Sequence, residues 1–189
     1  MKCRGNLQFF YKTIIKTLFW VLIISFIVVA TIDASIYMPN EIDDEYTYKD
    51  SFGTVSTSEV VFTCGRKWRK WTQFAGFGPV WVWTNDKSER VYIFANGRLQ
   101  LFVNFNAQQG SSWNINVGSC NKNVKIVLVA FDEIVIVPAG TFYGCILIDV
   151  GLSCNDAGVS SIWFAPNVGV VKWKSLNIAG PITSELTLQ

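Results

Sequence analysis

Residues 90–105 have the sequence RVYIFANGRLQLFVNF, two apolar runs joined by Asn96-Gly97. Asn-Gly between such runs is a strong signal for a β-hairpin, because both residues accept positive φ. Side chains of a strand alternate between two faces, so the second run is expected to bury every other side chain. The set expected to be buried is Leu99, Leu101, Val103 and Phe105, and the opposite set is Gln100, Phe102 and Asn104.

Short β-prone runs separated by turn signals continue on both sides of this hairpin, from Ser58 to the end of the chain, and no segment after residue 35 has helical periodicity. Val124–Val137 is too long for one ordinary strand, so it is expected to bend or break near Phe131–Glu133 and to end at Pro138. The predicted fold class is all-β: an antiparallel meander of about ten or eleven strands, forming a curved sheet or partly open barrel after one N-terminal hydrophobic helix. The other predicted strands are Glu59–Thr63, Lys67–Phe74, Val80–Thr84, Phe142–Val150, Ser160–Ala165, Gly169–Lys174 and Thr183–Leu188.

An apolar run near the N-terminus predicts export. Residues 18–30, LFWVLIISFIVVA, carry no charge, and their length lies between that of a signal-peptide core and that of a membrane-spanning helix. Basic residues precede the run and mainly acidic residues follow it, which places the N-terminus in the cytoplasm and the rest outside. A retained anchor is favoured over a cleaved signal, because the basic stretch is long and the cleavage patterns are mediocre. A buried core helix is the third alternative.

These signals divide the chain into three parts. Residues 1–32 are the predicted signal anchor or signal peptide, residues 33–57 are mostly an acidic linker or an edge segment, and residues 58–189 are the antiparallel β domain. The β domain is therefore expected outside the cytoplasm, in the periplasm or the extracellular space. It is tethered to the membrane if the N-terminal segment is retained, and secreted if that segment is cleaved.

Several motifs resemble a known group of proteins. They are VPAGTFYGC at 137–145, IWFAPNVGVVK at 162–172 and SELTL at 184–188, with GRKW at 65–68, VYIFANGRLQLF at 91–102 and GSSW at 110–113 upstream. Together they resemble a group of uncharacterised bacterial envelope proteins and lipoproteins, which is distantly similar to the half-barrel of periplasmic lipoprotein carriers. The resemblance implies an envelope location and β architecture, and it supplies no catalytic residues. This chain departs from the group by lacking a lipobox cysteine and by having an extra pair of cysteines.

Four cysteines follow the N-terminal segment: Cys64, Cys120, Cys145 and Cys154. Their spacing is not that of a zinc or redox motif, and an even number on the exported side favours disulfides. Three pairings are open. The preferred one joins Cys145 to Cys154, which would close a short loop, and leaves Cys64 to pair with Cys120. Buried free thiols are the alternative.

A basic and aromatic motif is the first candidate site. It comprises Arg66, Lys67, Trp68, Arg69, Lys70 and Trp71. Four cations interspersed with two tryptophans could contact anionic lipid headgroups or a polyanion, with the indoles at the interface. The alternative is a hairpin strand with solvated charges and packed rings.

Tryptophans elsewhere suggest a second candidate. Trp81 and Trp83 share one face of a predicted strand, and with Trp113 and Trp163 they could form a stacking platform for a sugar. Aromatic pairs on a strand more often belong to the core, which is the alternative.

Enzymatic chemistry is poorly supported. The chain has no histidine, which removes Ser-His and Cys-His pairs and His-ligated zinc. Asp132, Glu133, Asp149 and Asp156 could supply a carboxylate pair, but nothing in their spacing brings two of them together. No catalytic, cofactor-binding or metal-binding residue is expected, and no nucleic-acid partner.

We therefore predict a non-enzymatic envelope protein with a binding or structural role. Its expected partners are the membrane, through the N-terminal segment, and a lipid or other envelope component. The alternatives are a lipid- or lipoprotein-binding half-barrel with a concave apolar face and a carboxylate-dependent hydrolase.

Overall fold

The computed structural model describes residues 37–38, 45–64, 68–85, 89–117 and 123–188. The chain divides into two compact units, residues 1–33 and residues 34–189, and the described residues all belong to the second. The predicted N-terminal helix and anchor lie outside the described residues. Within those residues, no helix is long and apolar enough to cross a membrane.

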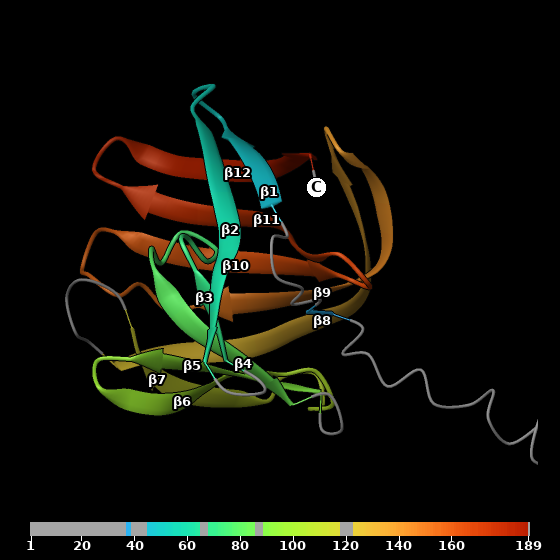
Figure 1. Ribbon diagram of the computed structural model, residues 1–189. Helices are drawn as coiled ribbons and strands as arrows, with labels where there is room; N and C mark the ends of the chain where they lie inside the picture. The colour runs from blue at the N-terminus through green and yellow to red at the C-terminus, as the bar shows by residue number, and fades with distance from the viewer. Residues whose placement is uncertain (1–36, 39–44, 65–67, 86–88, 118–122, 189) are drawn as a thin grey trace, which may run out of the picture. The chain divides into compact units, whose positions relative to one another are not determined.

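The second unit is all-β, as predicted. Its described residues form one sheet of twelve antiparallel strands in the order β6-β5-β4-β3-β2-β1-β12-β11-β10-β9-β8-β7. Figure 1 shows this sheet curving round on itself into a nearly closed barrel. The strands are β1 (Glu45–Asp50), β2 (Val55–Cys64), β3 (Trp68–Trp71), β4 (Val80–Asn85), β5 (Arg90–Ala95), β6 (Arg98–Asn104), β7 (Ser112–Asn116), β8 (Asn123–Val137), β9 (Gly140–Val150), β10 (Gly158–Ala165), β11 (Gly169–Asn177) and β12 (Gly180–Leu188).

The Asn-Gly turn joins β5 and β6 as expected. Asn96 and Gly97 have φ angles of 52° and 72°, the left-handed conformation that this turn requires. The predicted faces of β6 are partly wrong, because Phe102 is fully buried and Leu99 is 49% exposed. The ladder between β5 and β6 is irregular between Val91 and Tyr92, and this shift breaks the simple alternation.

The long β8 strand bends where the sequence predicts. Its ladder with β9 shifts register on both sides of Glu133, and Asp132 has a φ of 58°. A positive φ at a non-glycine residue marks a bulge that redirects the strand. The predicted bend near Phe131–Glu133 is confirmed.

The segment expected to be mostly linker contains part of the sheet. Residues 45–50 form β1, and β2 begins at Val55. Tyr46 and Tyr48 are buried, and the Tyr48 hydroxyl donates to the carbonyl of Val170 at 2.8 Å. Two rings in the core outweigh the acidic residues around them, so the linker ends before β1. The strand β7 was not predicted either.

One hydrophobic cluster fills the inside of the sheet. Its rings touch in series: Tyr46 lies 5.4 Å from Trp71, and Phe74 lies 5.7 Å from Trp71 and 5.2 Å from Phe102. Phe164, on β10, lies 5.2 Å from Phe105, just after β6. The interior formed by the described residues is therefore a packed core, which offers little support for the concave lipid-carrying face considered above.

Side chains close the sheet between its two end strands. The Gln100 amide donates to the carbonyl of Asn116 at 2.8 Å and accepts from the Asn116 backbone N–H. The Trp113 indole N–H donates to the carbonyl of Phe102 at 2.9 Å, and Asn96 also donates to Asn116. These bonds satisfy backbone groups of β6 and β7, which would otherwise be exposed edges.

Candidate binding face

Aromatic side chains gather on the outside of β3, β4, β5 and β6. The register places Trp68 opposite Trp83, Trp83 opposite Tyr92, and Trp81 opposite Phe94. Directly paired residues project to the same side of a sheet, and the alternate positions Val82 and Ile93 are buried. We call this surface the outer aromatic face, defined as Trp68, Trp81, Trp83, Tyr92, Phe94 and Leu99.

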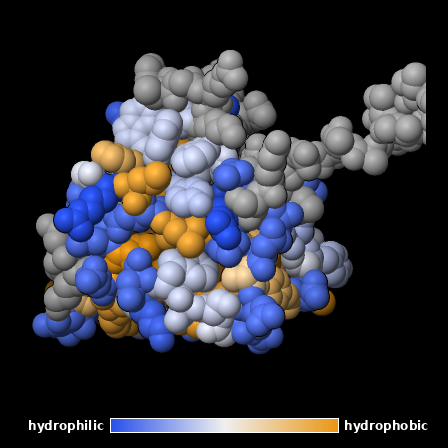
Figure 2. Space-filling model, turned by 90° about the horizontal axis from the view of Figure 1, so that it is seen from below, coloured by the Kyte–Doolittle hydropathy of each residue, from blue (hydrophilic) through white to orange (hydrophobic). Residues whose placement is uncertain are grey.

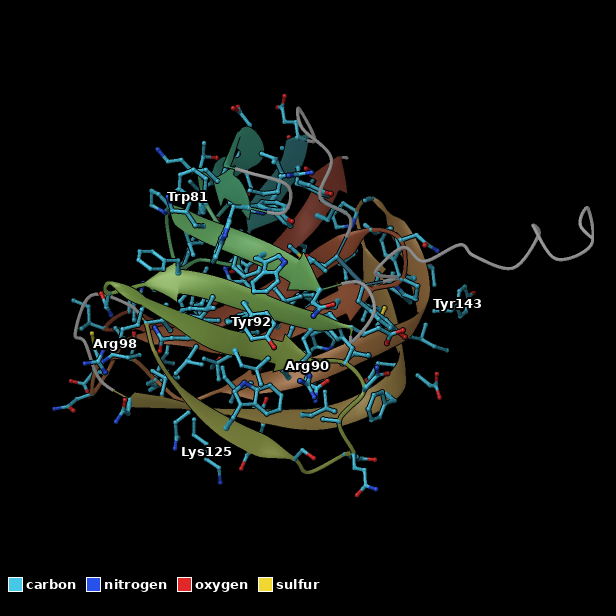
Figure 3. The ribbon with its side chains drawn as sticks, turned by 60° about the horizontal axis from the view of Figure 1, so that its bottom comes forward. Trp81, Arg90, Tyr92, Arg98, Lys125 and Tyr143 are labelled. Carbon is cyan, nitrogen blue, oxygen red and sulfur yellow. The ribbon has the colours of Figure 1, made fainter. Side chains whose placement is uncertain are left out.

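The rings of this face pack against one another. Trp83 stacks on Tyr92 with centroids 5.1 Å apart, and Trp68 lies 5.9 Å from Trp83 and 6.4 Å from Phe94. Phe94 is 45% exposed, whereas the tryptophans and Tyr92 are half-buried. The result is a continuous aromatic floor whose upper surface faces solvent. Figure 3 shows Tyr92 over the middle of these strands, with Trp81 farther along the sheet.

The same four strands are purely cationic. They contain Arg69, Lys70, Arg90 and Arg98 and no acidic residue. Lys70 pairs with Trp81 in the ladder, and Arg90 lies two positions before Tyr92 on the same side of β5. By contrast, Lys172 and Glu185 form an ion pair on β11 and β12. The outer aromatic face therefore carries positive charge that no acid on its own strands neutralises.

Polar side chains lie at one end of the face. Arg90 pairs with Asn85 on β4 and with Asn104 on β6, so one guanidinium and two amides end three adjacent strands. These groups offer several planar hydrogen-bond donors next to the ring floor. In Figure 2, hydrophobic residues gather near the middle of the lower side of the unit, with hydrophilic residues between and around them.

The structure divides the predicted basic and aromatic motif. Trp68 and Lys70 lie on the outer aromatic face, whereas Trp71 turns into the core and stacks on Tyr46. Arg69 is half-buried, and its guanidinium contacts the carbonyl of Trp68 at 3.5 Å. Arg66 and Lys67 lie outside the described residues. Two of the described members of the motif, Trp68 and Lys70, therefore belong to a larger surface, and its role as a lipid or polyanion contact stays a prediction.

The four tryptophans of the predicted sugar platform are not all together. Trp81 and Trp83 are on the outer aromatic face, and Trp113 bonds across the junction of β6 and β7. Trp163 lies on β10 beside the amines of Lys172 and Lys174, 5.9 and 5.5 Å from its ring centroid. Sequence reasoning missed Tyr92, Phe94 and Arg90. The signal for them is the period-two alternation of β5, which places Arg90, Tyr92 and Phe94 on one side of the strand.

The acidic residues are distributed along the sheet. Asp132 and Glu133 occupy the bend of β8, Asp149 accepts a hydrogen bond from the Ser161 hydroxyl at 3.0 Å, and Asp156 lies between β9 and β10. The described residues contain no group of three or more His, Cys, Asp or Glu side chains that could hold a metal ion.

One cysteine prediction is corrected. Cys145 is a free thiol buried in the core, so the preferred Cys145–Cys154 bond is not formed. Ile146, Ile148 and Val150 alternate inward along β9, and Cys145 is buried out of this alternation, directly after Gly144 with its φ of 66°. Its sulfur lies near the carbonyl of Phe142, whereas Cys154 lies beyond the end of that strand. Burial raises the pKa of the Cys145 thiol to about 11. Cys154 is disulfide-bonded, so its partner is a cysteine other than Cys145. The side chains of Cys64 and Cys120 lie outside the described residues, so the preferred Cys64–Cys120 bond stays a prediction.

No protein-family model matches the chain, and no curated protein matches it. Among solved structures, it is similar to a presumed exported protein with a YmcC-like fold from Bacteroides fragilis, at 14% identity and a TM-score of 0.45, over 82% of this chain and 98% of that chain. A presumed lipoprotein from Parabacteroides distasonis has 11% identity and a TM-score of 0.43, over 80% and 97%. The hypothetical lipoprotein YmcC from Escherichia coli has 11% identity and a TM-score of 0.35, over 100% and 98%. Similarity this low leaves the function to be inferred from this chain's own residues.

Proposed function

We propose that this chain is a non-enzymatic protein of the cell envelope, and that its β domain binds an acidic polysaccharide on the outer aromatic face. The observation that carries the proposal is the coincidence of the packed ring floor with four acid-free strands, three of which carry cations. Its expected location outside the cytoplasm rests on the N-terminal apolar run and the charges around it.

The ring floor suits a sugar chain in shape. Adjacent strands are about 4.8 Å apart, so the four strands make a surface about 14 Å wide, room for about two to three sugar rings. The C–H faces of pyranose rings pack on flat aromatic surfaces, because the electron-rich ring face attracts their weakly positive hydrogens. The half-buried rings of Trp83 and Tyr92 are already ordered by each other, so little freedom is lost on binding.

The charge favours an acidic ligand. Lys70 and Arg90 project from the same side of the sheet as the rings, at Trp81 and beside Tyr92. A guanidinium binds a carboxylate through two parallel hydrogen bonds, which suits a uronic acid. Asn85 and Asn104 provide further donors and acceptors for hydroxyl groups at the same end.

A membrane surface is the competing ligand for such a face. Insertion into lipid needs side chains that protrude, whereas the tryptophans of this face lie side by side and are half-buried. A lipid held inside the sheet would need an open interior, and the described interior is packed with rings. Both observations favour a ligand that lies flat on the outside.

Tryptophan fluorescence of the full chain in detergent tests the proposal. The chain is titrated with oligogalacturonate as the acidic probe, with cello-oligosaccharides as the neutral probe, and with phosphatidylglycerol vesicles. We expect a saturable change with oligogalacturonate that weakens severalfold when NaCl is raised to about 0.5 M, because salt screens exposed charges. The neutral oligosaccharide should bind more weakly.

Two results would contradict the proposal. Binding to phosphatidylglycerol vesicles without binding to oligogalacturonate would assign the face to lipid. Equal affinities for the acidic and the neutral oligosaccharide would show that Lys70 and Arg90 do not contribute, and that only stacking on the rings drives binding.

A further inference from the structure

A second exposed surface lies on the hairpin formed by β8 and β9. Ile134, Ile136 and Tyr143 are 60%, 72% and 67% exposed, which is unusual for large apolar and aromatic side chains on one hairpin. Val135 pairs with Phe142 and Ile136 with Thr141, so the three exposed side chains occupy alternate positions on one side. We call these three residues the hairpin patch.

The hairpin is held firmly from its other side. Val135 and Val137 are buried, and the backbone N–H of Ala139 at the turn donates to the carbonyl of Leu186 on β12 at 3.0 Å. The hairpin patch is therefore fixed on the surface of the domain. Figure 3 shows Tyr143 projecting from the outer edge of the unit, well away from Trp81.

The patch has the chemistry of a membrane contact. Residues 134–143, IVIVPAGTFY, carry no charge. Isoleucine favours hydrocarbon, and tyrosine favours the boundary between hydrocarbon and headgroups. Unlike the half-buried tryptophans of the outer aromatic face, these side chains protrude and can enter lipid.

The described chain enters the domain beside this patch, at Tyr37. The Tyr37 hydroxyl donates to the carbonyl of Gly144 at 3.1 Å, and its ring packs on Phe105 at 5.0 Å. The chain therefore joins the domain next to Tyr143. The predicted anchor segment ends at Ile32, and the five residues from there to Tyr37 can span at most about 18 Å. A retained anchor would hold Tyr37, and with it the hairpin patch, close to the bilayer surface.

From these observations we infer that Ile134, Ile136 and Tyr143 insert into the lipid interface of the membrane that holds the anchor. Three side chains make a weak contact alone, but the tether raises their effective concentration at the bilayer, so a weak contact suffices to orient the domain. The inference rests on retention of the N-terminal segment and not on the identity of any sugar ligand.

A dye at position 143 tests this in the full chain reconstituted into phosphatidylethanolamine–phosphatidylglycerol vesicles. Tyr143 is replaced by azidophenylalanine, which keeps the shape of tyrosine and avoids the native cysteines, and is coupled to a nitrobenzoxadiazole dye. The matched control carries the same dye at Ile178, an apolar residue that is 97% exposed in the turn between β11 and β12. Nitroxide lipids quench dyes that lie in the bilayer.

We expect severalfold stronger quenching, and a blue-shifted emission, at position 143 than at position 178. The double substitution Ile134→Ser and Ile136→Ser should return the dye at 143 to water, with unchanged circular dichroism. Equal water exposure at the two positions would overturn the inference, whether the N-terminal segment is retained or cleaved. The measurement is repeated at less than one chain per vesicle, where two copies cannot meet. If quenching at positions 143 and 178 then becomes equal, the patch contacts a second copy and not lipid, which would also overturn the inference.

Discussion

Two outer surfaces of the sheet use the same residue types in different ways. On β10, β11 and β12, Trp163 lies beside Lys172 and Lys174, and Lys172 also pairs with Glu185 at 2.6 Å. On β3 to β6, Trp68, Trp81 and Trp83 share a side with Lys70 and Arg90, and these strands contain no acid. On the first surface Glu185 neutralises one of the two lysines, whereas no described acid pairs with Lys70 or Arg90 on the second.

This difference teaches where a ligand should bind. A cation that already pairs with an acid and an aromatic ring gains little from a new partner, because those contacts must be given up. Lys70 and Arg90 have no acidic partner among the described residues to give up, so each would gain a carboxylate contact. Tryptophan and lysine on a surface therefore do not identify a site until their pairing is known.

The largest expected effect concerns the core beneath both surfaces. Cys145 should be alkylated more than about a hundredfold more slowly in the native chain than in urea at pH 8. Its pKa is raised from 9.0 to about 11, which leaves the reactive thiolate scarce, and burial blocks access as well. Mass spectrometry of the iodoacetamide-treated peptide measures this. Slow labelling of Cys145 also serves as a check that the core is intact in each of the variants described below. Rapid labelling of the native chain would contradict the buried position of Cys145.

Charge reversal should separate the two surfaces next most strongly. Lys70→Glu with Arg90→Glu should weaken oligogalacturonate binding about a hundredfold, because two favourable charge contacts become repulsive. Lys172→Glu with Lys174→Glu changes the same net charge on the other surface and is the matched control. Fluorescence titration compares the two variants. A similar loss in both would mean that net charge, and not the outer aromatic face, governs binding.

Removing one ring from the outer aromatic face should weaken ligand binding less than charge reversal does. Phe94→Ala should weaken oligosaccharide binding about tenfold, since an exposed ring contributes stacking area without supporting the core. Trp163→Ala is the aromatic control on the other surface and should leave binding unchanged. Isothermal titration calorimetry measures both. An undiminished affinity in Phe94→Ala would remove this ring from the proposed site.

The smallest expected effect is on stability, and it concerns the surface of β10 to β12 more than the outer aromatic face. Glu185→Gln should lower the free energy of unfolding by about 0.5–1 kcal/mol, because its partly exposed ion pair with Lys172 is lost. Lys70→Gln should change stability by less than about 0.5 kcal/mol, since no acid pairs with it among the described residues. Urea unfolding measures both. A larger cost for Lys70→Gln would show that this cation already has a structural partner.

Much of the fold could be predicted because its signals are local. The Asn96-Gly97 turn and the bend of β8 at Asp132 both follow from the conformations that neighbouring residues accept. The strands β1 and β7 escaped prediction because polar residues outnumber apolar ones in EYTYKD and SWNIN. Their buried members, among them Tyr46 and Ile115, are recognisable only once the rest of the core is in place.

Less of the candidate site could be predicted, because it joins residues from four strands. The basic motif includes Trp68 and Lys70 of the outer aromatic face, but it also includes Trp71, which is buried in the core against Tyr46. Tyr92 and Arg90 were overlooked because their importance comes from lying opposite Trp83 and Asn85. A single strand contains no information about its neighbour's register.

By itself, the sequence determined an antiparallel β domain that follows an apolar N-terminal run, with basic residues before this run and mainly acidic residues after it. Turn chemistry, period-two alternation and charge asymmetry all act between residues that are close along the chain. Only the tertiary structure decided which tryptophans face outward together, that Cys145 remains a free buried thiol, and that Tyr37 joins the domain beside Tyr143. Those outcomes depend on strand register and on the bulges that shift it, which are set by the packing of distant segments.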